Sequence, residues 1–154
     1  MKADPGTIEL REVRPDDLPI FFTQQLDPEA CAMAAVPARA RDAFDAHWAL
    51  VLADLGVVNR TVLADGSVAG HLACFTLHGR REVAYQLGRE FWGRGIASAA
   101  LALLLGELNE RPLYATVAEH NAGSLRVLEK CGFVRTGSQV AEDGVTEIRL
   151  ALGA

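Results

Sequence analysis

The pattern of hydrophobic and polar positions predicts seven β-strands. Short apolar or alternating segments bounded by turn-forming residues are typical of strands. Asp65-Gly66 and Glu142-Asp143-Gly144 are turn signals, so the strands on either side of each should form an antiparallel hairpin. The predicted strands span residues 8–14, 60–64, 68–77, 82–88, 112–118, 133–140 and 145–152.

Apolar residues three and four positions apart predict four helices. The first opens at Pro15-Asp16-Asp17, because proline and acidic residues favour the first turn of a helix. The stretch from Asp27 to Val36 is expected to be irregular. The other helices span residues 37–55, 96–109 and 122–130. The apolar face of the second consists of Phe44, Trp48, Val51, Leu52 and Leu55.

This order of elements predicts an α+β fold with one domain over residues 1–154, a length that suits a single folding unit. The sheet should be mixed and mostly antiparallel. A helix connects the strand at 82–88 to the strand at 112–118, and such a crossover is typical of parallel neighbours. Neither a secretory signal nor an apolar run long enough to cross a bilayer is visible. We therefore expect a cytoplasmic protein without a membrane partner.

Composition narrows the classes of function. A formal net charge of −5 argues against a broad basic surface for nucleic acid. Cys31, Cys74 and Cys131 are odd in number and far apart, which argues against a disulfide framework and against a zinc site. We expect no metal ion. Self-association as a homodimer stays open, because no heptad pattern decides it.

The segment from Leu87 to Ser98 has the features of an anion-binding turn. A strand ends, a loop with Gly93 and Gly95 follows, and a helix begins. The first N–H groups of a helix lack partners and carry partial positive charge, and glycines let a ligand approach the backbone closely. Such a turn can bind phosphate. Arg94 adds a positive charge to the turn. The alternative is a plain strand-to-helix turn, which would have the same glycines.

A second segment makes the chain resemble a known family. Asn121-x-x-Ser124 follows the strand at 112–118, and Leu128-Glu129-Lys130-Cys131-Gly132-Phe133 comes soon after. Together with Trp92-Gly93-Arg94-Gly95-Ile96-Ala97, these motifs resemble the Gcn5-related N-acetyltransferases (GNAT). Within that family the chain is most similar to the branch that includes the ribosomal-protein N-terminal acetyltransferases. The resemblance covers nearly the whole chain in element order.

The resemblance implies a binding site for acetyl-CoA between two splayed parallel strands. Backbone amides of the glycine loop would hold the coenzyme's diphosphate, and main-chain groups near Leu87 would pair with pantetheine. Asn121 would contact pantetheine, and Ser124 would donate a proton to the leaving thiolate. The implied coenzyme-binding residues are Leu87, Trp92, Gly93, Arg94, Gly95, Ile96, Ala97, Ser98 and Asn121.

The chain departs from the family pattern at several positions. Leu128 occupies the place of the tyrosine that is the general acid in many members, which leaves Ser124 as the candidate acid. Trp92 replaces the commoner Arg or Gln. Arg89 sits where proline is frequent, and Ala99 sits where the ribosomal branch often has Glu.

Other polar residues have both structural and functional interpretations. Glu119 is our candidate to take up the amine's proton, beside the expected thioester, with a solvated loop acid as the alternative. Asn121 and Ser124 would also suit a helix N-cap. Glu82 opens its strand and is expected to be a surface charge. Tyr85 fits either the acceptor pocket or the core.

The function that follows is an acetyl-CoA-dependent N-acetyltransferase. A primary amine, from a protein N-terminus or a small molecule, would attack the thioester directly, so neither a covalent enzyme intermediate nor a metal is needed. Catalysis then requires removal of the amine's proton and donors for the developing oxyanion. The alternative is a CoA-binding regulatory or interaction domain with little or no catalysis, which the change at Leu128 suggests.

Overall fold

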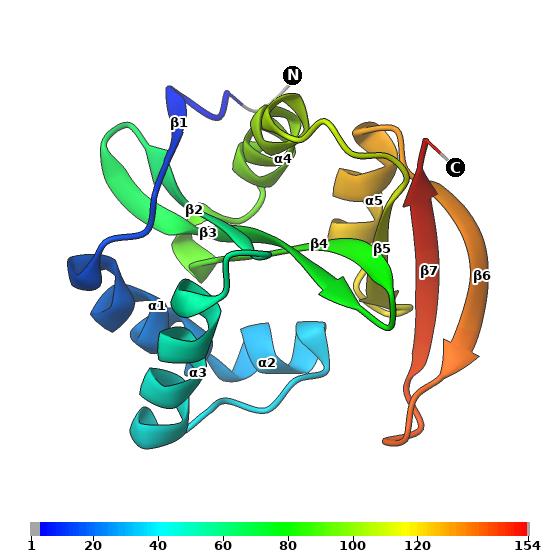
Figure 1. Cartoon of the computed structure of the whole chain (residues 1–154), viewed down its shortest axis with the longest axis horizontal. Helices are drawn as coiled ribbons and strands as arrows, with labels where there is room; N and C mark the ends of the chain where they lie inside the picture. Colours follow the sequence, from blue (N-terminus) through cyan, green and yellow to red (C-terminus); the bar gives the residue numbers. More distant parts are fainter. Residues whose placement is uncertain (1–3, 154) are drawn as a thin grey trace.

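A seven-stranded sheet runs through the centre of the computed structural model, which describes residues 4–153 (Figure 1). The strands lie in the order β1-β2-β3-β4-β5-β7-β6. The predicted α+β fold and mixed sheet are confirmed, with strand ends that differ by a few residues. The strands are β1 (Ile8–Arg11), β2 (Val58–Ala64), β3 (Ser67–Leu77), β4 (Arg80–Leu87), β5 (Leu113–Ala118), β6 (Val134–Val140) and β7 (Thr146–Leu152).

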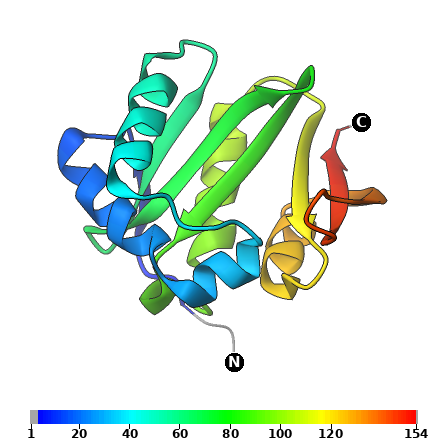
Figure 2. The same ribbon diagram turned by 90° about the horizontal axis from the view of Figure 1, so that it is seen from below.

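The centre of the sheet is split. β4 and β5 are parallel, as predicted, and they pair only where Glu82 meets Tyr114. The other neighbouring strands pair antiparallel over longer registers, eight positions for β3 with β4 and six for β5 with β7. From their paired ends β4 and β5 diverge toward Leu87 and Ala118 (Figure 2). We call the space between the two strands the split.

Five α-helices flank the sheet in the described part of the chain. α4 and α5 pack on one face, whereas α1, α2 and α3 lie on the other (Figure 2). The main core forms between the first face and the helices, where the side chains of Leu101 and Leu104 are fully buried. The helices are α1 (Leu18–Gln25), α2 (Pro28–Ala34), α3 (Arg41–Ala53), α4 (Ile96–Glu107) and α5 (Ala122–Lys130).

The prediction that residues 27–36 are irregular is wrong, because α2 occupies most of that stretch. The carboxylate of Asp27 caps the helix by accepting the N–H groups of Glu29 and Ala30 at 2.8 and 3.4 Å. Pro28 follows at the first helical position, where its missing N–H costs nothing. The helix ends at Ala35, which has left-handed backbone angles. An Asp-Pro-Glu start signal was thus present without a visible apolar stripe.

The second predicted helix begins later and is less buried than expected. α3 starts at Arg41 rather than near residue 37, because the side chain of Gln25 both donates to and accepts from the backbone of Arg39 and holds that segment outside the helix. Phe44 and Trp48 are buried as expected, together with Phe21 of α1. Leu52 and Leu55, expected on the same face, are 45% and 101% exposed.

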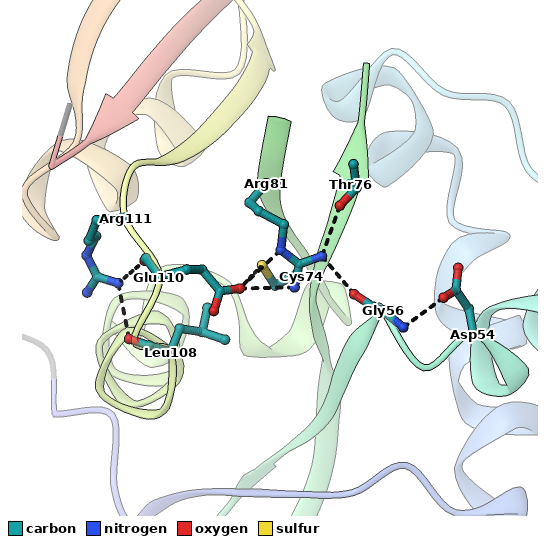
Figure 3. Close-up of polar contacts among 8 residues, drawn as sticks. All are labelled: Asp54, Gly56, Cys74, Thr76, Arg81, Leu108, Glu110 and Arg111. Atoms are coloured by element: carbon teal, nitrogen blue, oxygen red, sulfur yellow. Dashed lines mark hydrogen bonds and ion pairs between the residues drawn. The ribbon is translucent and has the colours of Figure 1, made fainter. Parts of the chain in front are cut away.

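Arg81 fastens the closed end of the split (Figure 3). Its Nε donates to Oε1 of Glu110 at 3.1 Å, and its Nη1 donates to the carbonyl oxygen of Gly56 at 2.7 Å. Glu110 lies in the loop before β5, and the thiol of Cys74 on β3 also points to this carboxylate at 3.9 Å. The start of β4 is therefore tied to the segments that lead into β5 and β2.

A buried carboxylate joins the N-terminal strand to the first helices. The side chain of Asp17 is buried, with 2% of the residue exposed. It accepts hydrogen bonds from both terminal nitrogens of Arg11, from the backbone N–H of Arg14 and from the hydroxyl of Thr61, at 2.7–2.9 Å. Burial alone would raise the pKa of Asp17. These hydrogen bonds and the charge of Arg11 outweigh burial and lower that pKa from 3.8 to about 2.

We predict that Asp17→Asn lowers the free energy of unfolding by about 2 kcal/mol at neutral pH. Because the folded-state pKa is depressed, the stabilisation is present above the ordinary value of 3.8 and is lost as the pH falls toward about 2. Urea unfolding as a function of pH measures it. Asp16→Asn, at the exposed neighbouring position, should leave stability within about 0.5 kcal/mol. An equal loss in both variants would contradict this account.

Candidate functional site

The turn that begins α4 is shaped by two glycines. β4 ends at Leu87, a 3₁₀ turn covers Arg89–Phe91, and α4 starts at Ile96. Gly93 and Gly95 have φ angles of 73° and 78°, in the left-handed region that side chains disfavour. Gly95 is the N-cap and has no side chain to satisfy the first turn. Glycine takes these backbone angles without the strain that a side chain would add.

The same turn presents free backbone donors. None of the N–H groups of residues 93–98 donates a hydrogen bond to any group in the part of the chain that the structure describes. They lie at the positive end of a 12-residue helix. Ile96 is 1% exposed, so only its backbone can reach a ligand. The guanidinium of Arg94 lies 5.8 Å from the ring centre of Phe91 and stays at the surface.

Trp92 holds this loop against the end of β4. Its indole N–H donates to the carbonyl oxygen of Leu87 at 3.1 Å. The ring is half-buried and packs against the main core. Trp92 thus fixes the distance between the free amides and the mouth of the split.

A cavity of about 300 Å³ lies beside the start of α4. Lys130, in the last turn of α5, lines this cavity and brings a positive charge to it, and the sequence alone did not predict it as a site residue. The cavity extends the anion-binding turn toward a second positive charge. Its lining residues are Pro5, Gly95, Ser98, Ala99, Ala102, Lys130 and Cys131.

Ser124 and Tyr85 meet across the split. The hydroxyl oxygens of the two residues are 2.7 Å apart, with Tyr85 on β4 and Ser124 in the first turn of α5. Asn121 is the N-cap of α5, and its Oδ1 accepts the backbone N–H of Ser124 at 3.2 Å. Leu128, at the position of the missing tyrosine, is 2% exposed and belongs to the core.

Glu82 is not the surface charge that the sequence suggested. It is 9% exposed and accepts the hydroxyl of Thr116 on β5 at 3.2 Å. The prediction failed because β4 begins two residues earlier, at Arg80, so that Glu82 falls at the pairing point with β5. A carboxylate therefore sits at the closed end of the split.

The open end of the split holds the other polar candidates. The side chain of Glu119 is exposed and makes no hydrogen bond among residues 4–153. His120 Nε2 lies 2.8 Å from the carbonyl oxygen of Ala32 in α2. Arg89 pairs with Asp27 at 2.8 Å, in the loop that leads into α2. α2 is thus tied to both strands where they are farthest apart.

A second cavity, of about 490 Å³, lies between α1 and the turn after β4. It opens on the face of the sheet that α1, α2 and α3 cover, opposite the first cavity. Asp27 and Glu90 bring negative charge to its wall and Arg89 brings positive charge. The full lining is Pro19, Ile20, Thr23, Gln24, Asp27, Gly88, Arg89 and Glu90.

Two further properties concern only the described residues. No helix among them is both long and apolar enough to span a bilayer. Nowhere in this part of the chain do three or more His, Cys, Asp or Glu side chains gather so that they could hold a metal ion.

The sequence is similar to that of known proteins. A family model described as an acetyltransferase (GNAT) domain matches residues 7–134. YdaF of Bacillus subtilis, named as a ribosomal N-acetyltransferase, is 32% identical over an alignment of length 114 that covers 68% of this chain and 60% of that protein. The chain thus spans less than two thirds of the length of the curated relatives it matches.

Solved structures show the same fold. Spermidine N-acetyltransferase from Vibrio cholerae, in complex with CoA and spermine, has a TM-score of 0.82 and 20% identity over 94% of each chain. RimL, a ribosomal alpha-N-protein acetyltransferase in complex with coenzyme A, has a TM-score of 0.79 and 17% identity over 94% of this chain and 93% of that one. At these identities the likeness is one of fold.

Proposed function

The chain belongs to the GNAT acetyltransferase family, and we propose from that premise that it transfers an acetyl group from acetyl-CoA to a primary amine. The observation that carries the proposal is the row of free amides at residues 93–98, placed at the mouth of an open split between two parallel strands. A diphosphate binds such amides, and an extended thioester arm fits between strand edges that lack partners.

In this proposal acetyl-CoA binds in an extended form from the start of α4 into the split. Its diphosphate meets the backbone of Gly93, Arg94, Gly95, Ile96, Ala97 and Ser98. The cavity at Lys130 takes the nucleotide end, which carries a further phosphate. The pantetheine arm then passes Leu87 and Asn121 and brings the thioester to Ser124. Trp92 acts indirectly, since its indole holds the loop that the diphosphate binds.

The amine approaches from the opposite face, where α1 and α2 border the second cavity. Glu82 and Glu119 are the carboxylates near the reacting centre. We place Glu82 first in the route of the amine's proton because it is buried at the closed end of the split. Glu119 relays the proton to solvent at the open end. Ser124 protonates the leaving thiolate.

The acceptor is a protein N-terminus or a small-molecule amine. YdaF supports the first class by its name, and the spermine complex supports the second by analogy of fold. The three cysteines are free thiols, which favours a reducing compartment such as the cytoplasm.

Gly95→Glu should weaken acetyl-CoA binding about tenfold or more, because a carboxylate would stand where the diphosphate meets the helix end. The substitution also forces a side chain onto a φ of 78°. Gly106→Glu is the matched control, since it lies near the other end of α4 with open space around its Cβ position. Titration calorimetry with CoA measures both variants. Unchanged affinity in Gly95→Glu would contradict the loop assignment.

Glu82→Gln should lower kcat about 100-fold with little change in the KM for acetyl-CoA, because the amine then lacks its buried proton acceptor. Glu119→Gln should lower kcat only about threefold, since water can replace an exposed relay. Steady-state kinetics over a range of pH compare the two. A larger loss in Glu119→Gln would reverse the order of the two carboxylates.

The second candidate function, a CoA-binding regulatory domain, is favoured by the buried Leu128 in place of an acid. Free-thiol release from acetyl-CoA separates the two functions. The panel should contain ribosomal N-terminal peptides, polyamines and aminoglycosides. We predict turnover above the hydrolysis background with at least one class. CoA binding without turnover on any amine would favour the regulatory function.

A further inference from the structure

The contact between Tyr85 and Ser124 joins two elements that only the fold brings together. Tyr85 projects from β4 toward the face of α4 and α5, and Ser124 begins α5 on the far side of the split. Their oxygens, 2.7 Å apart, are within strong hydrogen-bond distance, and either one could be the donor. The sequence analysis treated these two residues separately.

The direction of this hydrogen bond decides what Ser124 can do. A serine hydroxyl has one proton to donate and two lone pairs to accept with. When Ser124 donates to Tyr85, its proton is engaged. When Tyr85 donates to Ser124, the serine proton is free to turn toward a third group in the split. The backbone N–H of Ser124 is already bound to Asn121, so the first turn of α5 is fixed in either case.

The chemistry of the two groups favours Tyr85 as the donor. A phenol is more acidic than an alkyl hydroxyl, so it is the stronger donor when the two oxygens lie 2.7 Å apart. The phenol is also half-buried, and burial raises its pKa, so that it keeps its proton at neutral pH. The other tyrosine, Tyr114, lies on β5 with its ring under the guanidinium of Arg80 at 4.7 Å.

We propose that Tyr85 is a positioning residue that donates to the Oγ of Ser124 and so turns the serine hydroxyl proton toward the thioester sulfur. This inference rests on the proposed function. In this inference β4 supplies a phenol beside the reacting centre. The position on α5 at which many family members have a tyrosine holds the buried Leu128 instead.

The transfer step balances with these groups. The amine nitrogen bonds to the acetyl carbon and loses a proton, and the carbon–sulfur bond breaks with its electron pair on sulfur. Sulfur takes the hydroxyl proton of Ser124. Ser124 regains a proton from Tyr85, and Tyr85 regains one from the solvent, to which Glu82 and Glu119 pass the proton of the nitrogen. The products are the N-acetylated amine and the free thiol.

Tyr85→Phe tests the inference because it removes only the phenolic oxygen. We expect kcat with acetyl-CoA to fall about tenfold, with the KM for acetyl-CoA within about twofold of the wild type. Tyr114→Phe should leave kcat unchanged. In a Ser124→Ala background, Tyr85→Phe should cause no further loss, because the two residues act as one unit.

A thioester of a more acidic thiol separates positioning from packing. The thiophenolate that leaves S-acetyl thiophenol is a better leaving group and needs less assistance from an acid. With this donor, the loss of kcat on Tyr85→Phe should shrink to about twofold or less, after the uncatalysed reaction is subtracted. A residue that only packs the split would give the same loss with both donors, and that result would overturn the inference.

Three other outcomes would also overturn it. The first is an unchanged or higher kcat in Tyr85→Phe, which would make Ser124 the donor. The second is a loss of kcat on Tyr85→Phe that is equally large in the Ser124→Ala background. The third is failure of the wild type to acetylate any amine, which would overturn the proposed function as well.

If Tyr85→Phe does not fold, absorbance titration gives a second test. In a Tyr114→Phe background Tyr85 is the one tyrosine left in the chain. Adding Ser124→Ala should raise the pKa of the Tyr85 phenol, because the phenolate that forms at high pH then loses the serine hydroxyl that would donate to it. An unchanged titration would show that the two hydroxyls do not meet.

Discussion

The single residue pair between β4 and β5 is the constraint on which the rest of the structure depends. Each strand is held along its outer edge by an antiparallel partner, β3 or β7, so the inner edges can part without loss of the sheet. Arg81 and the Glu82–Thr116 contact keep the strands together at one end. Beyond that point two strand edges lack ladder partners, and such edges readily pair with an extended ligand.

The geometry of the split also suits the proposed chemistry. The free amides of α4 lie at its mouth on one face, and the cavity beside α1 opens on the other. A thioester and an amine can therefore meet from opposite sides without displacing each other. α2 is anchored through Asp27 to Arg89 and through Ala32 to His120, which fixes the wall on the amine's side.

Apolar segments and turn signals were enough to predict the sheet, α4 and α5, although β6 is exposed along its whole length. They were not enough for α2, in which Ala30 is the one buried residue. That helix depends on the cap at Asp27 and on contacts with Arg89 and His120, more than 50 residues away. No pattern in a local window of sequence contains those contacts.

The candidate site, too, has a part that the sequence suggests and a part that it does not. The free backbone amides of residues 93–98 agree with the anion-binding turn that Gly93 and Gly95 suggested, although a plain strand-to-helix turn would have the same glycines. The side-chain pairs could not be predicted, because Tyr85 with Ser124 and Glu82 with Thr116 depend on the register across the split. Lys130 was hidden for a similar reason, since only the packing of α5 beside α4 brings it to the cavity.

The most direct test of this account is a crystal structure of the protein with coenzyme A. We predict diphosphate oxygens within hydrogen-bond distance of the N–H groups of residues 93–98, with the thiol between β4 and β5 next to Ser124. A coenzyme bound away from the start of α4, or a thiol outside the split, would contradict the account.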